Sequence, residues 1–133
     1  MQIKIKYTDI SSLKPYNKRR LKAQMAIIFN KKVPVNDNLI KAISMVKLST
    51  NKEVRIRKTL INKLTINEIW VVLVRNRERN IEKIKEFVSG VVKILELYGL
   101  HENINNVMIP LSYMKYKKMY DETNGVCIKY YNF

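Results

Sequence analysis

The chain has 133 residues, of which 47% are apolar, and a formal net charge of +15. This length is typical of one compact domain, and this apolar content excludes a disordered tail. The single cysteine, Cys127, excludes an intrachain disulfide and a metal cage of the Cys/His type.

The first thirty residues predict a strand followed by a helix. Residues 2–8 alternate apolar and basic, which is typical of a half-buried strand with its lysines facing outward. Pro15 suits the first turn of a helix, where its missing N–H costs nothing. Leu21, Met25 and Ile28 are spaced by four and three residues, so we expect one helical face to continue to about Asn30.

The middle of the chain contains one ambiguous element and two predicted strands. Residues 38–48 fit either a helix capped by Asp37, with Leu39, Ile40, Ile43 and Val46 inward, or a strand over 44–48. Residues 53–61 alternate, with Val54 and Ile56 on the opposite face from Arg55 and Arg57. The apolar and aromatic run within 66–74 predicts a central strand covered on both faces.

The second half predicts a long helix and shorter elements. Asn80 is the expected N-cap, Gly99 the expected C′ residue, and the apolar stripe between them is Ile81, Ile84, Val88, Val91, Leu95 and Tyr98. Residues 106–111 predict a strand, which Pro110 assigns to a sheet edge. Residues 112–121 fit a loop or a short helix, and 126–131 fit a last strand after the Asn124-Gly125 turn.

This order of elements predicts an α+β fold of the ferredoxin-like, split βαβ type. We expect an antiparallel sheet with two helices on one face, plus a C-terminal extension. Residues 1–111 would form a basic α+β RNA-binding domain, and residues 112–133 a Tyr/Lys-rich extension packed on the same domain. The longest apolar run, 69–74, is far shorter than the about 20 residues that cross a membrane, and no signal peptide is predicted, so no membrane partner is expected.

The charge is concentrated in the first half of the chain. Residues 1–67 contain 16 Lys and Arg against three acids, whereas residues 68–133 contain ten against eight. A compact body with this much positive charge repels itself, so a polyanion is its natural partner. Each phosphate that Lys or Arg neutralises releases counterions, which favours nucleic acid over simple solubility as the reason for the charge.

Groups that could perform catalysis are few. His101, the only histidine, follows the long helix and is expected to interact with its C-terminus. Cys127 lies in an apolar alternation, which favours a core position, and the helix acids Glu82, Glu86 and Glu96 are typical of a solvated face. We therefore expect no enzyme activity, no catalytic or metal site, no cofactor and no small-molecule substrate.

Three groups of cations are the predicted RNA-binding residues. Every second residue of an extended segment faces the same way, so arginines at that spacing present a row of planar guanidinium groups to phosphates and bases. The alternative is that these charges guard exposed strand edges. The predicted set is Lys14, Lys18, Arg19, Arg20 and Lys22, then Lys52, Arg55, Arg57, Lys58 and Lys63, then Arg75, Arg77 and Arg79.

The C-terminal stretch interleaves tyrosine and lysine. Tyrosines next to cations can stack on unpaired bases. However, Tyr113, Tyr116 and Tyr120 also lie at helical spacing, so core packing is the favoured interpretation.

Ile3-Lys4-Ile5-Lys6 with Asp9, and Val33-Pro34-Val35, resemble segments of a known family. That family is the tenth protein of the small ribosomal subunit, and the two segments resemble its opening strand and the segment before its hairpin. Asn51-Lys52 and Val54-Arg55-Ile56-Arg57 resemble its hairpin tip and basic strand, and 91–97 with 107–109 its second helix and last strand. The resemblance implies a ferredoxin-like fold that binds ribosomal RNA and neighbouring ribosomal proteins as a structural constituent of the subunit.

Lys, Ile and Asn are abundant, with 19, 17 and 14 copies, which indicates an AT-rich gene. An organellar gene would place the protein in the mitochondrial ribosome, and otherwise the cytoplasm is expected. Two other functions fit the same charge. One is a free-standing nucleic-acid-binding regulator of an AT-rich virus or bacterium, and the other is an accessory subunit of another organellar complex.

Overall fold

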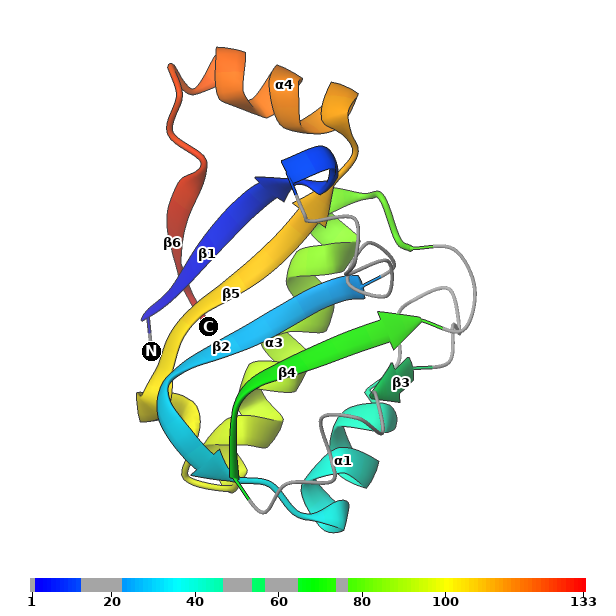
Figure 1. Ribbon diagram of the computed structural model, residues 1–133, viewed down its shortest axis with the longest axis vertical. Helices are drawn as coiled ribbons and strands as arrows, with labels where there is room; N and C mark the ends of the chain where they lie inside the picture. The colour runs from blue at the N-terminus through cyan, green and yellow to red at the C-terminus, as the bar shows by residue number, and fades with distance from the viewer. Residues whose placement is uncertain (1, 13–22, 47–53, 57–64, 74–76) are drawn as a thin grey trace.

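The computed structural model describes residues 2–12, 23–46, 54–56, 65–73 and 77–133 (Figure 1). The fold is α+β, with a mixed sheet and helices packed against it. The strands are β1 (Gln2–Asp9), β2 (Ala23–Pro34), β3 (Val54–Ile56), β4 (Thr65–Leu73), β5 (Ile104–Leu111) and β6 (Ile128–Asn132). The α-helices are α1 (Asp37–Ser44), α3 (Ile81–Leu97) and α4 (Tyr113–Glu122).

The six strands follow the order β3-β4-β2-β5-β1-β6 across the sheet. Strands β1 and β5 are parallel, with Ile5 opposite Val107 and Asp9 opposite Leu111. The other neighbouring strands are antiparallel. The expectation of a purely antiparallel sheet is therefore wrong at the β1–β5 pair.

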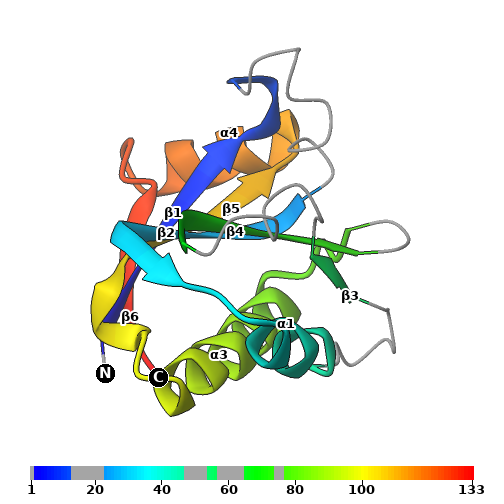
Figure 2. The same ribbon diagram turned by 60° about the horizontal axis from the view of Figure 1, so that its bottom comes forward.

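Two strand–helix–strand units interleave in the centre of the sheet. Strands β2 and β3 run in the same direction with β4 between them, and α1 lies between β2 and β3 in the chain. Strands β4 and β5 also share a direction, with β2 between them and α3 as their connection. Figure 2 shows α1 and α3 together on one face of the sheet.

The core lies between that face and the two helices. Strand β1 buries Ile3, Ile5 and Tyr7 in it, whereas Lys6 is exposed and Lys4 half-buried, which confirms the predicted alternation. Helix α3 contributes its apolar side, which includes Phe87. The consecutive residues 69–71 of β4 are all buried, so this strand is covered on both faces, as predicted.

The caps of α3 are the predicted residues. The Asn80 side-chain oxygen accepts hydrogen bonds from the backbone N–H groups of Glu82 and Lys83, at 3.0 and 3.3 Å. Gly99 has a φ of 70°, the left-handed conformation that ends many helices. Tyr98 is 38% exposed at the C-cap, so its predicted place in the buried stripe is wrong.

The ambiguous segment after residue 38 is helical. Leu39 and Ile43 of α1 are buried, and Ile40 packs partly buried against the same core. The N-cap is Asn36 rather than Asp37, because the Asn36 side-chain oxygen accepts a hydrogen bond from the Leu39 N–H at 2.9 Å.

The predicted helix is wrong over residues 23–30, because residues 23–34 form β2. Its predicted first part, from Pro15 to residue 22, lies outside the described residues. Residues 23–27 are all buried in this interior strand. A strand covered on both faces has no polar alternation, so the spacing of Met25 and Ile28 imitates a helical face.

Pro110 lies in an interior strand, so the predicted edge position is also wrong. Strand β5 pairs with β1 on one side and with β2 on the other. The β2 ladder extends along β5 only to Met108, and β2 has a bulge between Ala23 and Met25. The missing N–H of Pro110 therefore leaves no gap in the ladder to β2.

The C-terminal residues form a helix and a strand. Helix α4 is followed by Asn124 and Gly125, which have φ values of 54° and 86° and confirm the predicted turn. Strand β6 then pairs with β1. Tyr116 packs partly buried against the core, whereas Tyr113 and Tyr120 are 54% and 47% exposed, so the prediction of core packing holds for Tyr116 alone.

Candidate nucleic-acid interface

A buried glutamine fixes the segment that carries two of the predicted arginines. The Gln24 side chain is 1% exposed, at the bulge of β2. Its Oε1 accepts a hydrogen bond from the Glu78 N–H at 2.7 Å, and its Nε2 donates to the Glu78 carbonyl at 3.3 Å. A β-bulge changes the direction in which side chains point. Here the Gln24 amide, at the bulge, bonds both the N–H and the carbonyl of Glu78, which is 54 residues later in the chain.

The Glu78 carboxylate accepts hydrogen bonds from backbone N–H groups just before α3. Its Oε1 accepts hydrogen bonds from the backbone N–H groups of Arg79 and Asn80, at 3.1 and 3.2 Å. The side chains of Gln24 and Glu78 thus hold the backbone of residues 78–80 by hydrogen bonds. These bonds fix the backbone positions from which the side chains of Arg77 and Arg79 extend.

Arg77 and Arg79 interact through their charges. Arg77 is half-buried, and its Nη1 lies 3.4 Å from the Pro110 carbonyl oxygen, to which it donates. Burial lowers the pKa of the Arg77 guanidinium, and the positive charge of Arg79 lowers it further. The structure thus brings together two arginines of the predicted row, and Arg75 lies outside the described residues.

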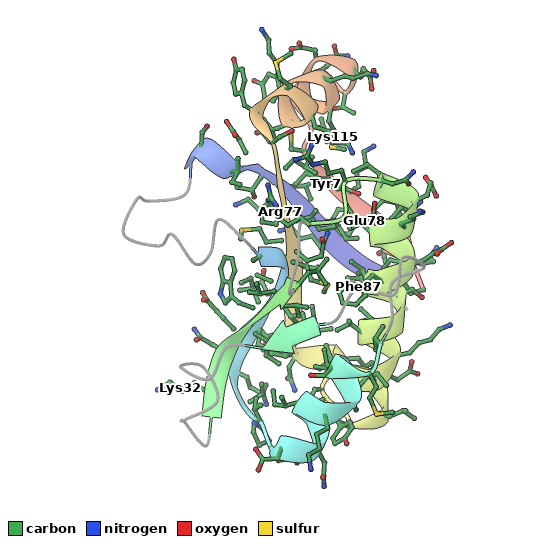
Figure 3. All side chains as sticks on the ribbon, turned by 90° about the vertical axis from the view of Figure 1, so that its right-hand side faces the viewer. Tyr7, Lys32, Arg77, Glu78, Phe87 and Lys115 are labelled. Atoms are coloured by element: carbon green, nitrogen blue, oxygen red, sulfur yellow. The ribbon has the colours of Figure 1, made fainter. Side chains whose placement is uncertain are left out.

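Lys115, in the first turn of α4, joins these arginines. Burial of its ammonium group and the charge of Arg79 lower the pKa of Lys115, whereas the Glu78 carboxylate partly offsets them. Figure 3 shows Arg77, Glu78 and Lys115 near Tyr7, where β1 and β5 end. We call Arg77, Arg79 and Lys115 the cation triad.

The cation triad can hold an anion that carries several oxygens. Burial, and after it the positive charge of Arg79, lowers the pKa of both Arg77 and Lys115, so a nearby anion would favour their charged forms. Among the described carboxylates, that of Glu78 acts on Lys115 with the opposite sign and favours its charged form. A phosphate group between the three cations would relieve their repulsion and accept charge-assisted hydrogen bonds.

Most other predicted RNA-binding residues lie outside the described residues. These are Lys14, Lys18, Arg19, Arg20, Lys22, Lys52, Arg57, Lys58, Lys63 and Arg75. The flanks of 13–22 are Ser12, just after β1, and Ala23, the first residue of β2, and both lie at the end of the sheet that holds the cation triad. Arg55 lies in β3, paired with Val72 of β4.

Lys115 is absent from the predicted set. The tyrosines around it predicted either stacking on bases or core packing, and Lys115 is 36 positions from Arg79 in the chain. Only the placement of α4 at the end of the sheet brings Lys115 within electrostatic range of Arg79 (Figure 1), so no local pattern signals this interaction.

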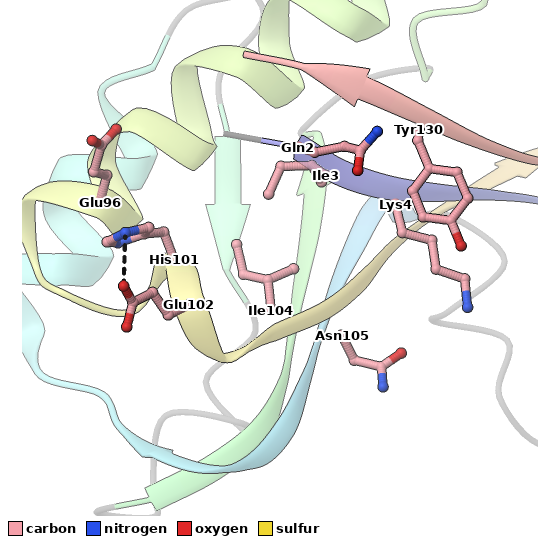
Figure 4. A pocket seen from close by; sticks show the side chains of 9 residues that line it. All are labelled: Gln2, Ile3, Lys4, Glu96, His101, Glu102, Ile104, Asn105 and Tyr130. Atoms are coloured by element: carbon pink, nitrogen blue, oxygen red, sulfur yellow. Dashed lines mark ion pairs between the residues drawn. The ribbon is translucent and has the colours of Figure 1, made fainter.

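A hollow of about 490 Å³ opens at the other end of β1 and β5 (Figure 4). Its lining includes Lys4 from β1, Tyr130 from β6, Glu96 from α3, and His101, Glu102 and Asn105 near the start of β5. The tyrosine ring lies beside the lysine at one side of the hollow, and the histidine and both carboxylates lie at the other.

His101 faces this hollow. Backbone N–H groups donate hydrogen bonds to the carbonyl groups in the last turn of α3. One of them, the Leu100 N–H, donates to the Leu95 carbonyl at 2.9 Å. The His101 Nε2 lies 4.0 Å from Glu102 Oε1, and its Nδ1 is buried without a hydrogen-bond partner.

Within the described residues, no three side chains among His, Cys, Asp and Glu gather as metal ligands do. Cys127 is half-buried and packs against the core. Among the described helices, none combines the length and the apolar composition that a bilayer crossing requires. In comparisons with known proteins, no family model, no curated protein and no solved structure matches the chain.

Proposed function

We propose that this protein binds RNA and is a structural constituent of the small ribosomal subunit. The cation triad is the observation that carries the RNA-binding proposal. Its three side chains come from two segments distant in the chain. Burial and the charge of Arg79 disfavour the charged forms of Arg77 and Lys115, and a bound anion would favour them. A phosphate-bearing polymer supplies such anions at regular intervals.

The distribution of charge supports a polymer over a single phosphate. The chain carries 26 Lys and Arg against 11 acids, far more than one anion could balance. Five of these cations lie in 13–22, and the described residues on either side of it, Ser12 and Ala23, lie at the same end of the sheet as the cation triad. A surface built this way binds the backbone of RNA with little dependence on base sequence.

The arrangement of residues 23–111 supports the ribosomal assignment. These residues run in the order strand, helix, strand, strand, helix, strand, and their strands β3, β4, β2 and β5 are antiparallel neighbours in that order. We interpret this as a ferredoxin-like arrangement to which β1 and β6 are added, the fold that the ribosomal resemblance implies. The arrangement begins at β2, whereas the resemblance placed the opening strand at Ile3-Lys4-Ile5-Lys6.

Exposed apolar side chains support a place among protein neighbours. Met114 on α4 is 75% exposed and Tyr113 beside it 54% exposed. In a ribonucleoprotein particle such a helix face is available to neighbouring ribosomal proteins.

Filter binding of the purified protein to ribosomal RNA over a range of salt concentrations tests the RNA-binding proposal. The logarithm of the association constant should fall linearly with the logarithm of the salt concentration. The cation triad alone would give a slope of about −2, and the slope of the whole protein should be steeper. An affinity that stays constant from low to moderate salt would contradict it.

Sedimentation of the native protein in a sucrose gradient tests whether the protein belongs to the small ribosomal subunit. Co-migration with the small subunit, lost after RNase treatment, supports a ribosomal constituent. A free small species would indicate a regulator, and a large particle that survives RNase would indicate another complex.

A further inference from the structure

Strand β6 places an exposed aromatic ring beside a lysine on the sheet face that α1 and α3 leave uncovered. Ile3 is buried on the helix side, so its neighbour Lys4 faces the other way. Lys4 is directly opposite Tyr130 in the antiparallel β1–β6 pair, so the two share that face. Tyr130 is 60% exposed and stands at the rim of the 490 Å³ hollow (Figure 4).

The groups around the hollow are sorted by chemistry. At one side are a flat aromatic ring, Tyr130, and an ammonium group, Lys4. At the other are the carboxylates of Glu96 and Glu102 and the half-buried ring of His101. An anion is attracted to the Lys4 side and repelled from the carboxylate side, whereas a neutral hydrogen-bond donor is favoured by the carboxylates.

A nucleotide has the matching distribution: a phosphate, an aromatic base, and donors on the edge of that base. We propose that this hollow binds one unpaired nucleotide of a single-stranded RNA, with its base stacked on Tyr130 and its phosphate beside Lys4. The base edge then faces Glu102, which can only accept hydrogen bonds when ionised. A base with an exocyclic amino group, such as cytosine, is therefore preferred over uracil.

This inference rests on the proposed function, because the nucleotide belongs to the same RNA that meets the cation triad. Asn105, in the lining of the hollow, is five residue steps along β5 from Pro110, whose carbonyl accepts from Arg77. At about 3.4 Å per residue the two sites are about 17 Å apart. Lys6 is exposed on the same face of β1 as Lys4, so a single strand that runs along β1 meets a cation between the two sites.

Binding of the whole protein to fluorescent oligocytidylate and to an RNA duplex, measured by anisotropy, tests the site. Tyr130→Ala should weaken oligocytidylate binding about tenfold, because one base–aromatic stack is lost. Tyr130→Phe should bind like the unmodified protein, and Tyr130→Leu, which keeps apolar bulk without a ring face, like Tyr130→Ala. Duplex binding should be the same in all of them, since paired bases are not accessible for stacking.

Met45→Ala is the matched control, because it also removes an exposed apolar side chain, 77% accessible, but from the end of α1. It should leave both affinities unchanged. Thermal unfolding of each variant shows that it is folded before its affinity is compared.

The preference of the hollow is tested with oligouridylate of equal length. Oligocytidylate should bind several-fold more tightly, and Glu102→Gln should abolish this difference, because an amide can also donate to the uracil oxygen. Free cytidine monophosphate should compete only weakly with the oligonucleotide. Strong competition would indicate a site for a mononucleotide instead of a strand, and would overturn the proposal.

Equal single-strand affinity in Tyr130→Ala and the unmodified protein would overturn the inference, and so would a failure of Tyr130→Phe to restore binding. Both results leave RNA binding by the cation triad intact, because duplex binding reports it separately. If the unmodified protein bound neither duplex nor single strand, the proposed function itself would fail.

Discussion

The Gln24 side-chain amide forms hydrogen bonds with both the backbone N–H and the backbone carbonyl of Glu78, 54 residues later in the chain. The amide thus satisfies the two backbone groups of Glu78 in the way that a neighbouring strand would. Because Arg77 and Arg79 flank Glu78, this contact couples the bulge of β2 to the position of the cation triad.

Replacement of Gln24 tests this coupling. Gln24→Ala leaves the Glu78 N–H and carbonyl without their partner in a region where the glutamine is 1% exposed. The free energy of unfolding should fall by about 2 kcal/mol, and RNA affinity should fall as well, because the arginines lose their anchor. Urea denaturation and anisotropy measure the two effects. Asn30→Ala, an exposed position of the same strand, should change stability by less than about 0.5 kcal/mol.

Gly90 permits α3 to approach the end of α1. A Cβ atom added at Gly90 would lie 2.8 Å from Val46 Cγ1, closer than carbon atoms pack. Gly90→Ala should therefore lower the free energy of unfolding by about 1 kcal/mol, even though alanine favours helix more than glycine. The double variant Val46→Ala/Gly90→Ala should be more stable than the sum of the two single changes predicts. Additive single effects would contradict the contact.

The Tyr7–Tyr131 contact predicts a loss of stability at alkaline pH. Tyr7 is buried, its hydroxyl lies 3.0 Å from that of Tyr131, and burial followed by this hydrogen bond raises the pKa of Tyr7 well above its usual value near 10. Above about pH 10 the unfolded chain loses a proton that folded Tyr7 retains, so the free energy of unfolding falls as pH rises. This one group contributes about 1.4 kcal/mol per pH unit.

Urea denaturation between pH 9 and pH 11 measures this effect, and Tyr7→Phe is the comparison. The variant should be about 1 kcal/mol less stable at neutral pH, because it loses the hydrogen bond. Its stability should fall less steeply above about pH 10. Parallel pH profiles of the two proteins would show that Tyr7 is not the group responsible.

We expect the charge of Lys115 to lower the stability of the fold and to strengthen RNA binding. Its lowered pKa means that the charged form is less favourable in the folded protein than in the unfolded chain, so the charge costs stability at neutral pH. Lys115→Met should raise the free energy of unfolding by about 0.5 kcal/mol at low salt and weaken RNA binding. Lys117→Met, on the exposed side of the same helix, should not stabilise the protein. A destabilised Lys115→Met protein would be the opposite result.

Elements with local signals were predictable from the sequence. Helix α3 is recognisable because Asn80 caps it and Gly99 ends it, and both act through neighbours a few residues away. Strand β1 is recognisable because one of its faces is apolar and the other basic.

Elements determined by distant partners were not predictable. Strand β2 is buried on both faces, so Met25 and Ile28 carry no alternation, and their spacing indicated a helix. The parallel pairing of β1 with β5 and the electrostatic interaction of Lys115 with Arg79 have no local signal either. Of the candidate site, the sequence indicated the arginines but not the lysine that completes the triad.

The salt dependence of RNA binding by Arg77→Gln/Arg79→Gln/Lys115→Gln tests the central claim most directly. Its control is Lys41→Gln/Lys83→Gln/Lys93→Gln, which removes the same charge from α1 and α3. The triad variant should lose about 2 units from the slope of the logarithm of affinity against the logarithm of salt, and the control should lose much less. Equal slopes in the two variants would contradict the assignment of the cation triad to RNA phosphates.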